Sequence, residues 1–221
     1  RLSTMGVTRV FDPERVVLVA DHFSPAKDVQ SAELIRTLRD FANQFGIRHY
    51  YDTFNGGIEH AVLADIGKVF PGALVFGADS HTCTAGALNA AGVGFGSTDL
   101  AAVLALGELW AQVPEAIRID LIGKPRAYVT GKGVILELIR RIGSDGGLNC
   151  ALEFDGEGLA TLNIDERKAI ANMAVEAGAE TCVMAADDAV RSYVHAHGGP
   201  VDNAVKPDIN AVYRQHITIN L

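Results

Sequence analysis

The chain has 221 residues, of which 48% are hydrophobic and 21% are charged, and its formal net charge is −8. These values are typical of a globular protein with a buried core, and they exclude a disordered chain. The acidic balance, without any basic run, argues against nucleic acid as the main partner, and no apolar stretch is long enough to cross a bilayer. Since no signal-peptide pattern is present, we expect a cytoplasmic protein.

Apolar runs with the period of a strand alternate with runs of helical period, which predicts an α/β domain with a mostly parallel sheet. In the first half of the chain we expect strands at residues 16–20, 49–54 and 73–77, and helices at residues 34–45, 56–66 and 98–111. Gly46 is expected to end the first helix, and Thr98 to cap the third. Gly92, Gly94 and Gly96 lack the spacing of a dinucleotide-binding loop, and we interpret them as sites of close helix packing.

The same alternation continues in the second half. Residues 116–122 and 126–129 predict a hairpin, and Thr130 is expected to cap a helix that runs to residue 142. The remaining expected elements are strands at 148–154, 181–185 and 216–220, and helices at 165–177 and 187–196. We interpret residues 1–221 as one α/β region with residues 199–207 as its best linker candidate. Neither end resembles a finished terminus, so we expect a piece of a longer polypeptide.

Two of the expected strands end in an acid–histidine pair. Asp21 and His22 follow the first strand, and Asp79, Ser80 and His81 follow the third. Ligands of open α/β sheets gather beyond the carboxyl ends of the strands. A carboxylate beside an imidazole fixes its tautomer and raises its basicity, as an acid or base catalyst requires. The repetition therefore predicts an active site, although the first pair taken singly also fits an Asx-type turn with a surface histidine.

Further polar residues lie at positions where a side chain is expected to need a hydrogen-bond or ion-pair partner. Residues 79–84 are six polar or reactive side chains directly after a buried strand, and such a run is costly unless its groups are paired or meet a ligand. His60, early in a short helix, fits a structural half-buried histidine as well as a functional one. Glu153 lies near the end of an apolar strand, where a histidine at another strand end would satisfy its charge.

The three cysteines are Cys83, Cys150 and Cys182. Their odd number and wide spacing argue against a disulfide framework, and no Cys-x-x-Cys is present to form a recognisable thiolate metal site. Cys83 lies two residues after His81, but adjacent loop residues often point apart, so a nucleophilic role is not favoured. Cys150 and Cys182 lie in expected strands and are interpreted as core thiols.

Several of these motifs together resemble the aconitase superfamily. The matching segments are Gly77–Thr84 (Gly-Ala-Asp-Ser-His-Thr-Cys-Thr), Gly96–Leu100, Trp110–Glu115, Asp21–Phe23, Gly57–His60, Pro71–Gly72, Leu152–Phe154 and Asn172–Gly178. The likeness covers nearly the whole chain and is nearest to the 3-isopropylmalate dehydratase large-subunit branch and its homoaconitase-like relatives. It implies a three-layer α/β/α fold with a mostly parallel sheet. It also implies a hydro-lyase that isomerises a 2-hydroxy dicarboxylic or tricarboxylic acid by removing water and adding it back.

The resemblance implies catalytic roles for three histidines and the acids that orient them. The expected pairs are His22 with Asp21, His60 with Asp79, and His81 with Glu153. In this scheme His22 protonates the departing hydroxyl, and Ser80 binds a substrate carboxylate.

The same resemblance implies a [4Fe–4S] cluster, in which one iron without a protein ligand acts as a Lewis acid on the substrate. The family holds this cluster with one isolated cysteine and a Cys-x-x-Cys, which we expect beyond Leu221, because Cys83, Cys150 and Cys182 do not match the ligand positions. No metal ligand is therefore expected within these residues. A small partner subunit carrying a swivelling domain is also implied, as is a heterodimer in leucine biosynthesis, so the chain alone is expected to be inactive.

One alternative stays open on the residues alone. The chain could be a non-catalytic protein of this fold that binds a carboxylate or a divalent ion, with His22, His60, His81 and Glu153 as nitrogen and oxygen ligands. An RNA-binding role is not favoured, because the chain is acidic and has no basic stripe.

Overall fold

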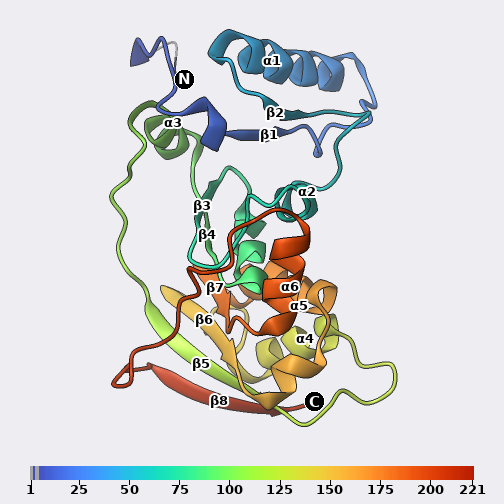
Figure 1. The fold of residues 1–221 in the computed structure, drawn as a ribbon, viewed down its shortest axis with the longest axis vertical. Helices are drawn as coiled ribbons and strands as arrows, with labels where there is room; N and C mark the ends of the chain where they lie inside the picture. Colours follow the sequence, from blue (N-terminus) through green and yellow to red (C-terminus); the bar gives the residue numbers. More distant parts are fainter. Residues whose placement is uncertain (1, 3–4) are drawn as a thin grey trace. The chain divides into compact units, whose positions relative to one another are not determined.

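The computed structural model describes residue 2 and residues 5–221. The chain divides into two compact units, which are described separately (Figure 1). The first unit comprises residues 1–65 and 96–111, and the second comprises residues 66–95 and 112–221. Residues 199–207, the linker candidate, lie within the second unit.

The first unit is built on two parallel strands, β1 (Val17–Val19) and β2 (His49–Tyr51). Its helices are α1 (Val29–Phe45), α2 (Glu59–Asp65) and α3 (Ser97–Leu106), with a 3₁₀ turn at Pro13–Arg15. Buried apolar side chains from α1, α3 and the segments beside them form one core, with members Leu2, Val10, Ala42, Phe45, Ile47 and Ala101. This core supports the strand pair whose carboxyl ends carry the first predicted acid–histidine pair.

Local signals at both ends explain the extent of α1. The Asp28 carboxylate accepts a hydrogen bond from the Ser31 backbone N–H at 2.8 Å, which satisfies one of the free donors of the first turn. Gly46 ends the helix with a left-handed φ of 67°, as the sequence predicts. Helix α3 differs from its prediction. It is capped by Gly96 rather than Thr98, and it ends at Leu106 because Gly107 adopts a left-handed φ of 78°.

The second unit is built on a four-stranded sheet in the order β7-β6-β5-β8. Its strands are β5 (Glu115–Ile122), β6 (Cys150–Asp155), β7 (Thr181–Met184) and β8 (Gln215–Asn220), all parallel. Helices α4 (Gly131–Ile142), α5 (Ile164–Asn172) and α6 (Asp188–Ala196) lie on the same side of these strands (Figure 1). Ile117, Ile119 and Leu121 of β5 are fully buried, whereas Arg118 and Asp120 alternate with them on the other face.

A second pair of parallel strands, β3 (Leu74–Gly77) and β4 (Ala91–Gly94), flanks the 3₁₀ helix Ser80–Leu88. Gly92 and Gly94 lie in β4, and the close helix packing predicted for them is against the start of the 3₁₀ helix Ser80–Leu88. A Cβ atom on Gly92 would lie 2.0 Å from the Thr82 carbonyl oxygen, and one on Gly94 would lie 2.6 Å from that of Asp79. These glycines therefore let the polar loop after β3 pack directly on the backbone of β4.

The predicted hairpin at residues 116–129 is wrong. Residues 126–129 form a turn, in which Val129 N–H donates to the Arg126 carbonyl at 3.0 Å and Tyr128 has a φ of 70°. The neighbours of β5 are β6 and β8, which are parallel to it and distant in sequence. The helix expected at residues 165–177 is α5 followed by a 3₁₀ helix, Met173–Ala177.

The predicted α/β class with mostly parallel strands is confirmed, since the structure is mixed α/β and the ladders between its described strands are parallel. The antiparallel pairing seen in the described residues is an isolated bridge between Leu148 and Ala179. In the part of the chain that the structure describes, no helix combines the length and the apolar character needed to cross a membrane.

Candidate functional site

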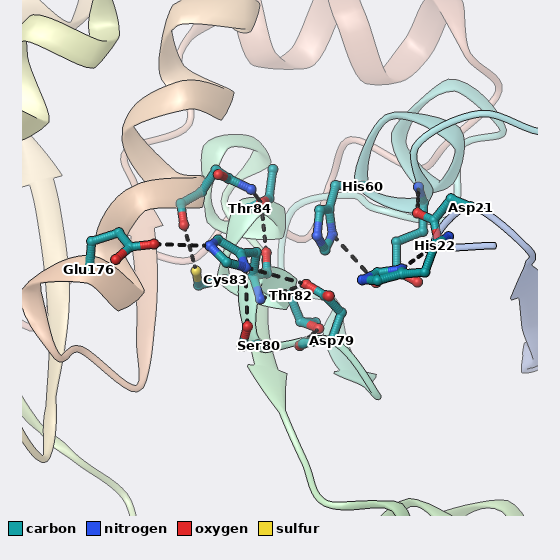
Figure 2. A network of polar contacts seen from close by, with 12 residues as sticks. Asp21, His22, His60, Asp79, Ser80, Thr82, Cys83, Thr84 and Glu176 are labelled. Carbon is teal, nitrogen blue, oxygen red and sulfur yellow. Dashed lines mark hydrogen bonds and ion pairs between the residues drawn. The ribbon is translucent and has the colours of Figure 1, made fainter. Parts of the chain in front are cut away.

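The first acid–histidine pair lies just beyond the carboxyl end of β1. One oxygen of the Asp21 carboxylate, Oδ1, lies 2.8 Å from His22 Nδ1 and also accepts the His22 backbone N–H at 2.8 Å (Figure 2). The other oxygen, Oδ2, accepts the Glu59 backbone N–H at 2.8 Å, at the start of α2. The Asp21 side chain is 13% exposed and the His22 side chain 62% exposed. The carboxylate is thus anchored while the imidazole reaches solvent.

This contact sets the chemistry that His22 is able to perform. With its Nδ1–H donated to the carboxylate, a neutral ring presents Nε2 as an acceptor, and a protonated ring presents an Nε2–H donor. The proton is assigned to Nδ1 of the neutral ring because Nδ1 is the nitrogen that contacts the Asp21 carboxylate. A ring held in this way is suited to give a proton to a group at Nε2 and to take it back.

A cleft of about 270 Å³ opens beside Asp21 at the carboxyl ends of β1 and β2. Its walls include Ser24 and Thr53, whose hydroxyl groups share a hydrogen bond of 2.7 Å. Gly56 also lines the cleft, and a Cβ atom there would lie 2.5 Å from the Asp52 carbonyl oxygen. The cleft was not predictable from the sequence, because its lining residues are ordinary loop residues that come together only when the two strands pair.

The polar run after β3 satisfies much of its own hydrogen bonding. Asp79 Oδ1 accepts the His81 backbone N–H at 2.7 Å, and the Asp79 carbonyl accepts the Thr82 hydroxyl at 2.6 Å. The Thr84 hydroxyl donates to the His81 carbonyl at 2.7 Å. Part of the run's polarity is therefore used to build the 3₁₀ helix, and the His81 ring is the group that this helix presents.

The His81 imidazole is held at both nitrogens within the second unit. Its Nδ1 lies 3.1 Å from Ser80 Oγ and 3.6 Å from Asp79 Oδ1. Its Nε2 lies 3.3 Å from Glu176 Oε1, as Figure 2 shows. Glu176 belongs to the 3₁₀ helix Met173–Ala177, and its side chain is 55% exposed.

The predicted pairing of His81 with Glu153 is corrected. Among the described residues, the acid that contacts the His81 ring at Nε2 is Glu176, while Glu153 Oε2 accepts the Tyr213 hydroxyl at 3.0 Å. The reason is strand geometry. Leu152 and Phe154 are buried against the helices, so Glu153 between them points to the opposite face of the sheet. The local sequence around Glu153 could not have revealed this, because the face to which Glu153 points depends on which side of the sheet the helices cover.

Glu176 and Asn172 were not predicted as site residues, although both lie in the segment Asn172–Gly178 that resembles the family. The Asn172 side-chain amide donates to Thr84 Oγ1 at 2.9 Å, and the Asn172 carbonyl accepts from Cys83 Sγ at 3.4 Å. This segment therefore fixes the loop that carries His81. The signal in the sequence that could have indicated Glu176 was a carboxylate inside a family motif, in a segment that follows a helix.

The remaining predicted pair, His60 with Asp79, consists of residues from different units. His60 lies in α2 of the first unit, and Asp79 lies in the second. Their pairing stays a prediction, as does the binding of a substrate carboxylate by Ser80.

The three cysteines of the chain lie in surroundings that do not suit cluster ligands. All three are buried; burial raises the pKa of Cys83 to about 11, and it also raises the pKa of Cys182 well above its ordinary value. Cys150 Sγ lies 3.2 Å from Arg214 Nη1. Cluster ligands are thiolates, and in the described residues no cysteine belongs to a group of potential metal ligands. These cysteines do not fit an iron–sulfur cluster.

The chain is similar to proteins of a known family. A family model described as the aconitase family (aconitate hydratase) matches residues 7–220. The chain is 48% identical over all 221 residues to the 3-isopropylmalate dehydratase large subunit 2 of Rubrobacter xylanophilus, of which it covers 52%. It is 49% identical over 216 residues (98% of the chain) to the 3-isopropylmalate dehydratase large subunit of Moorella thermoacetica, of which it covers 51%. The chain thus spans about half the length of the curated relatives it matches.

Proposed function

The chain belongs to the aconitase family, and we propose on that basis that it is part of the large subunit of a hydro-lyase of the 3-isopropylmalate dehydratase type. The observation that carries the proposal is the Asp21–His22 contact of 2.8 Å at the carboxyl end of β1. It is a positioned acid–base pair of the kind that dehydration requires. The non-catalytic alternative is not favoured, because the similar large subunits are named as dehydratase subunits.

The proposed reaction removes water from a 2-hydroxy dicarboxylic acid and adds it back in the other orientation. Hydroxide is a poor leaving group, so the hydroxyl must gain a proton as its carbon–oxygen bond breaks. Protonated His22 supplies that proton from Nε2, and Asp21 at Nδ1 stabilises the charged ring beforehand. The electron pair of the broken carbon–hydrogen bond forms the double bond, and the proton from that carbon goes to a base on the partner subunit.

The residues of the second unit are proposed to hold the substrate and its water. Ser80 and Glu176 restrain the His81 ring from its two nitrogens, which leaves the ring little freedom to rotate. In our proposal His81 and Asp79 handle the released water and Ser80 binds a substrate carboxylate, while the pairing of Asp79 with His60 stays a prediction. The polar contacts within residues 79–84 support this role, because they fix the loop before any substrate arrives.

The family implies an iron–sulfur cluster, which supplies Lewis-acid chemistry at the substrate oxygens when it is bound. Since Cys83, Cys150 and Cys182 are buried and do not fit such a cluster, we propose that its ligands are cysteines outside these 221 residues. We also propose a small partner subunit with a swivelling domain, because the similar proteins are named large subunits. The cytoplasmic location stays a prediction.

Dehydration of 3-isopropylmalate, measured anaerobically, tests the proposal. The complete native polypeptide should turn the substrate over when it is supplied with iron, sulfide and its small partner subunit. The 221-residue chain alone should show no turnover, since it lacks both the cluster ligands and the partner. Robust turnover by the isolated chain without iron or partner would contradict the proposal, and so would a fully assembled enzyme that leaves hydroxy acids of this class unchanged.

A further inference from the structure

The proton transfer proposed for His22 makes no use of the cleft at the carboxyl ends of β1 and β2. This cleft, which we call the β1–β2 cleft, has a volume of about 270 Å³. Its lining residues lie in the two strands and in the loops that follow them: Val19, Ala20, Asp21, Ser24, Pro25, Tyr51, Asp52, Thr53, Gly56, Gly57 and Ile58. All of them belong to the first unit. The carboxyl ends of parallel strands are a usual position for ligands.

Hydrogen bonds fix the two loops that form the cleft. The Ser24 hydroxyl of the first loop donates to Thr53 Oγ1 of the second at 2.7 Å. Within the second loop, the Asp52 backbone N–H donates to Asn55 Oδ1 at 2.8 Å. The Gly56 N–H donates to the Asp52 carbonyl at 2.7 Å, and the absence of a Cβ atom on Gly56 permits this tight turn. The walls of the cleft are therefore held in place before a ligand arrives, as preorganised sites require.

The ionised side chains that line the cleft are both carboxylates, and each is already paired. Asp21 contacts the His22 ring at 2.8 Å, and Asp52 accepts a hydrogen bond from Arg39 at 3.0 Å. Among the described residues that line the cleft, none is a lysine, an arginine or a histidine. A carboxylate of a ligand would therefore lose water beside two like charges without gaining a counter-ion of its own, which is unfavourable.

The rest of the lining suits an uncharged group of a few carbon atoms. Apolar surface comes from Val19, Ala20, Pro25, Tyr51 and Ile58. An alkyl group needs no hydrogen-bond partner, so it can leave water for this surface without the cost that a carboxylate incurs. Sites for whole small molecules usually have volumes of about 300–1,000 Å³. Since the cleft is smaller, it suits one substituent of a substrate better than the whole molecule.

We propose that the β1–β2 cleft binds the substituent on the carbon next to the one that loses its hydroxyl, and that it selects an alkyl group against a carboxylate. The inference rests on the proposed function, because His22 places the reacting hydroxyl. His22 contacts Asp21, which lines the cleft, so a substituent on the neighbouring carbon comes close to the cleft when the hydroxyl reaches His22. Thr53 and Ile58 of the second loop are then residues that determine specificity.

Two substrates that differ in this substituent alone test the selection. 3-Isopropylmalate carries an isopropyl group at this carbon, and isocitrate carries a carboxymethyl group on the same malate skeleton. The measurement is kcat/KM for the dehydration of each compound by the assembled native enzyme, anaerobically and with its partner subunit. We expect kcat/KM for 3-isopropylmalate to exceed that for isocitrate by at least about 100-fold.

Thr53→Lys gives the sharpest form of the test, because it places a cation in the cleft. Thr53 is exposed, so lysine can be accommodated without disturbing the core. The added counter-ion should lower the ratio of kcat/KM for 3-isopropylmalate to that for isocitrate by about tenfold or more. Thr53→Val removes the hydroxyl without adding a charge and should keep the ratio. Gln44→Lys is the matched control for the added charge, because Gln44 is exposed in the last turn of α1, which leads to the amino end of β2.

Ile58→Ala tests the apolar wall separately. Loss of this side chain should lower kcat/KM for 3-isopropylmalate about tenfold and change that for isocitrate less. An unmodified enzyme that turns over neither compound would contradict the proposed function, and this inference with it. Turnover of 3-isopropylmalate with an unchanged ratio in Thr53→Lys, an equal fall of the ratio in Thr53→Val or Gln44→Lys, or no effect of Ile58→Ala would overturn the inference alone.

Discussion

Asp21 makes three contacts at once, and together they explain how two residues adjacent in sequence form an acid–base pair. Its Oδ1 atom accepts from both the backbone and the ring of His22, so the short loop after β1 closes on itself. Its Oδ2 atom accepts from Glu59 N–H, which joins the loop to α2. A His22 ring restrained in this way needs little reorganisation to donate a proton.

Glu176→Gln should separate the role of Glu176 from that of Glu153. In the assembled enzyme we expect kcat to fall roughly tenfold to a hundredfold, as when carboxylates that orient metal-bound histidines are removed, with a changed pH profile and little change in KM. Glu153→Gln is the matched control, because Glu153 contacts Tyr213 and not His81. A larger loss of kcat in Glu153→Gln than in Glu176→Gln would restore the original pairing.

Sequence alone could predict Asp21 with His22 because the two residues are neighbours. It could not predict Glu176 with His81, since 95 residues separate them and many other carboxylates lie at similar distances along the chain. The choice between Glu153 and Glu176 depends on which face of β6 the helices cover. That property belongs to the folded unit and not to either residue.

At the scale of elements, helices with strong end signals were predicted well. Helices α4 and α6 begin within one residue of their expected starts, whereas α1 begins at Val29, five residues before residue 34. Asp28, Thr130 and Asp187 occupy the N-cap positions of these helices. The hairpin prediction failed because strand character does not specify a partner. The run at residues 116–122 is a strand, but its neighbours are chosen by the packing of α4 and α5 on one face of the sheet.

An ion pair between the buried Arg167 and the partly exposed Asp187 joins α5 to the start of α6, and Asp187→Asn should show its contribution. Arg167 has 0% exposed surface and donates to Asp187 Oδ1 at 2.9 Å. Asparagine still caps α6, so the substitution removes the charge and leaves Arg167 buried without its counter-ion. We expect the free energy of unfolding in urea to fall by about 3 kcal/mol. Asp188→Asn, at the exposed pair with Arg191, should change it by less than about 0.5 kcal/mol.

The same pair predicts a dependence of stability on pH. Burial acts to raise the pKa of Asp187, but the hydrogen bonds from Arg167 and Val190 outweigh it, so the pKa lies below its ordinary value. A group with a lowered folded pKa stabilises the fold above its unfolded pKa, about 3.9, and loses that contribution as the pH falls further. Urea unfolding between pH 6 and pH 3 should therefore show a steeper loss below about pH 4 in the unmodified chain than in Asp187→Asn. Identical slopes would contradict this assignment.

At the scale of the whole molecule, the cysteines should be unreactive in the folded chain. Cys83, Cys150 and Cys182 are buried, and the raised pKa of Cys83, about 11, keeps its thiol protonated at neutral pH. We expect slow alkylation by iodoacetamide without denaturant and rapid alkylation of all three with it. We also expect that treatment with iron and sulfide leaves the 221-residue chain without the visible absorption of a cluster. Formation of a stable cluster on this chain would show that these thiols do serve as ligands.

The alternation of strand and helix patterns was enough to predict the α/β class, and the motifs at the strand ends were enough to predict the family. The division into two units was not predictable in this way. Residues 96–111, for example, belong to the same unit as residues 1–65, although β3 and β4 of the other unit lie between them in the sequence. Ala101 packs in the same core as Ala42 and Phe45. Whether a segment packs with residues distant in the sequence depends on long-range contacts, which the local pattern of hydrophobic residues does not show.

In our proposal His22, held by Asp21, donates the proton to the departing hydroxyl. The most direct test compares dehydration of 3-isopropylmalate by the assembled native enzyme with that by its His22→Gln variant, using His195→Gln on the exposed surface of α6 as the matched control. Glutamine cannot serve as an acid, so kcat should fall by about 10²–10⁴, with near-normal KM. If His22→Gln kept kcat within a few-fold of the unmodified enzyme, another group would have to supply the proton.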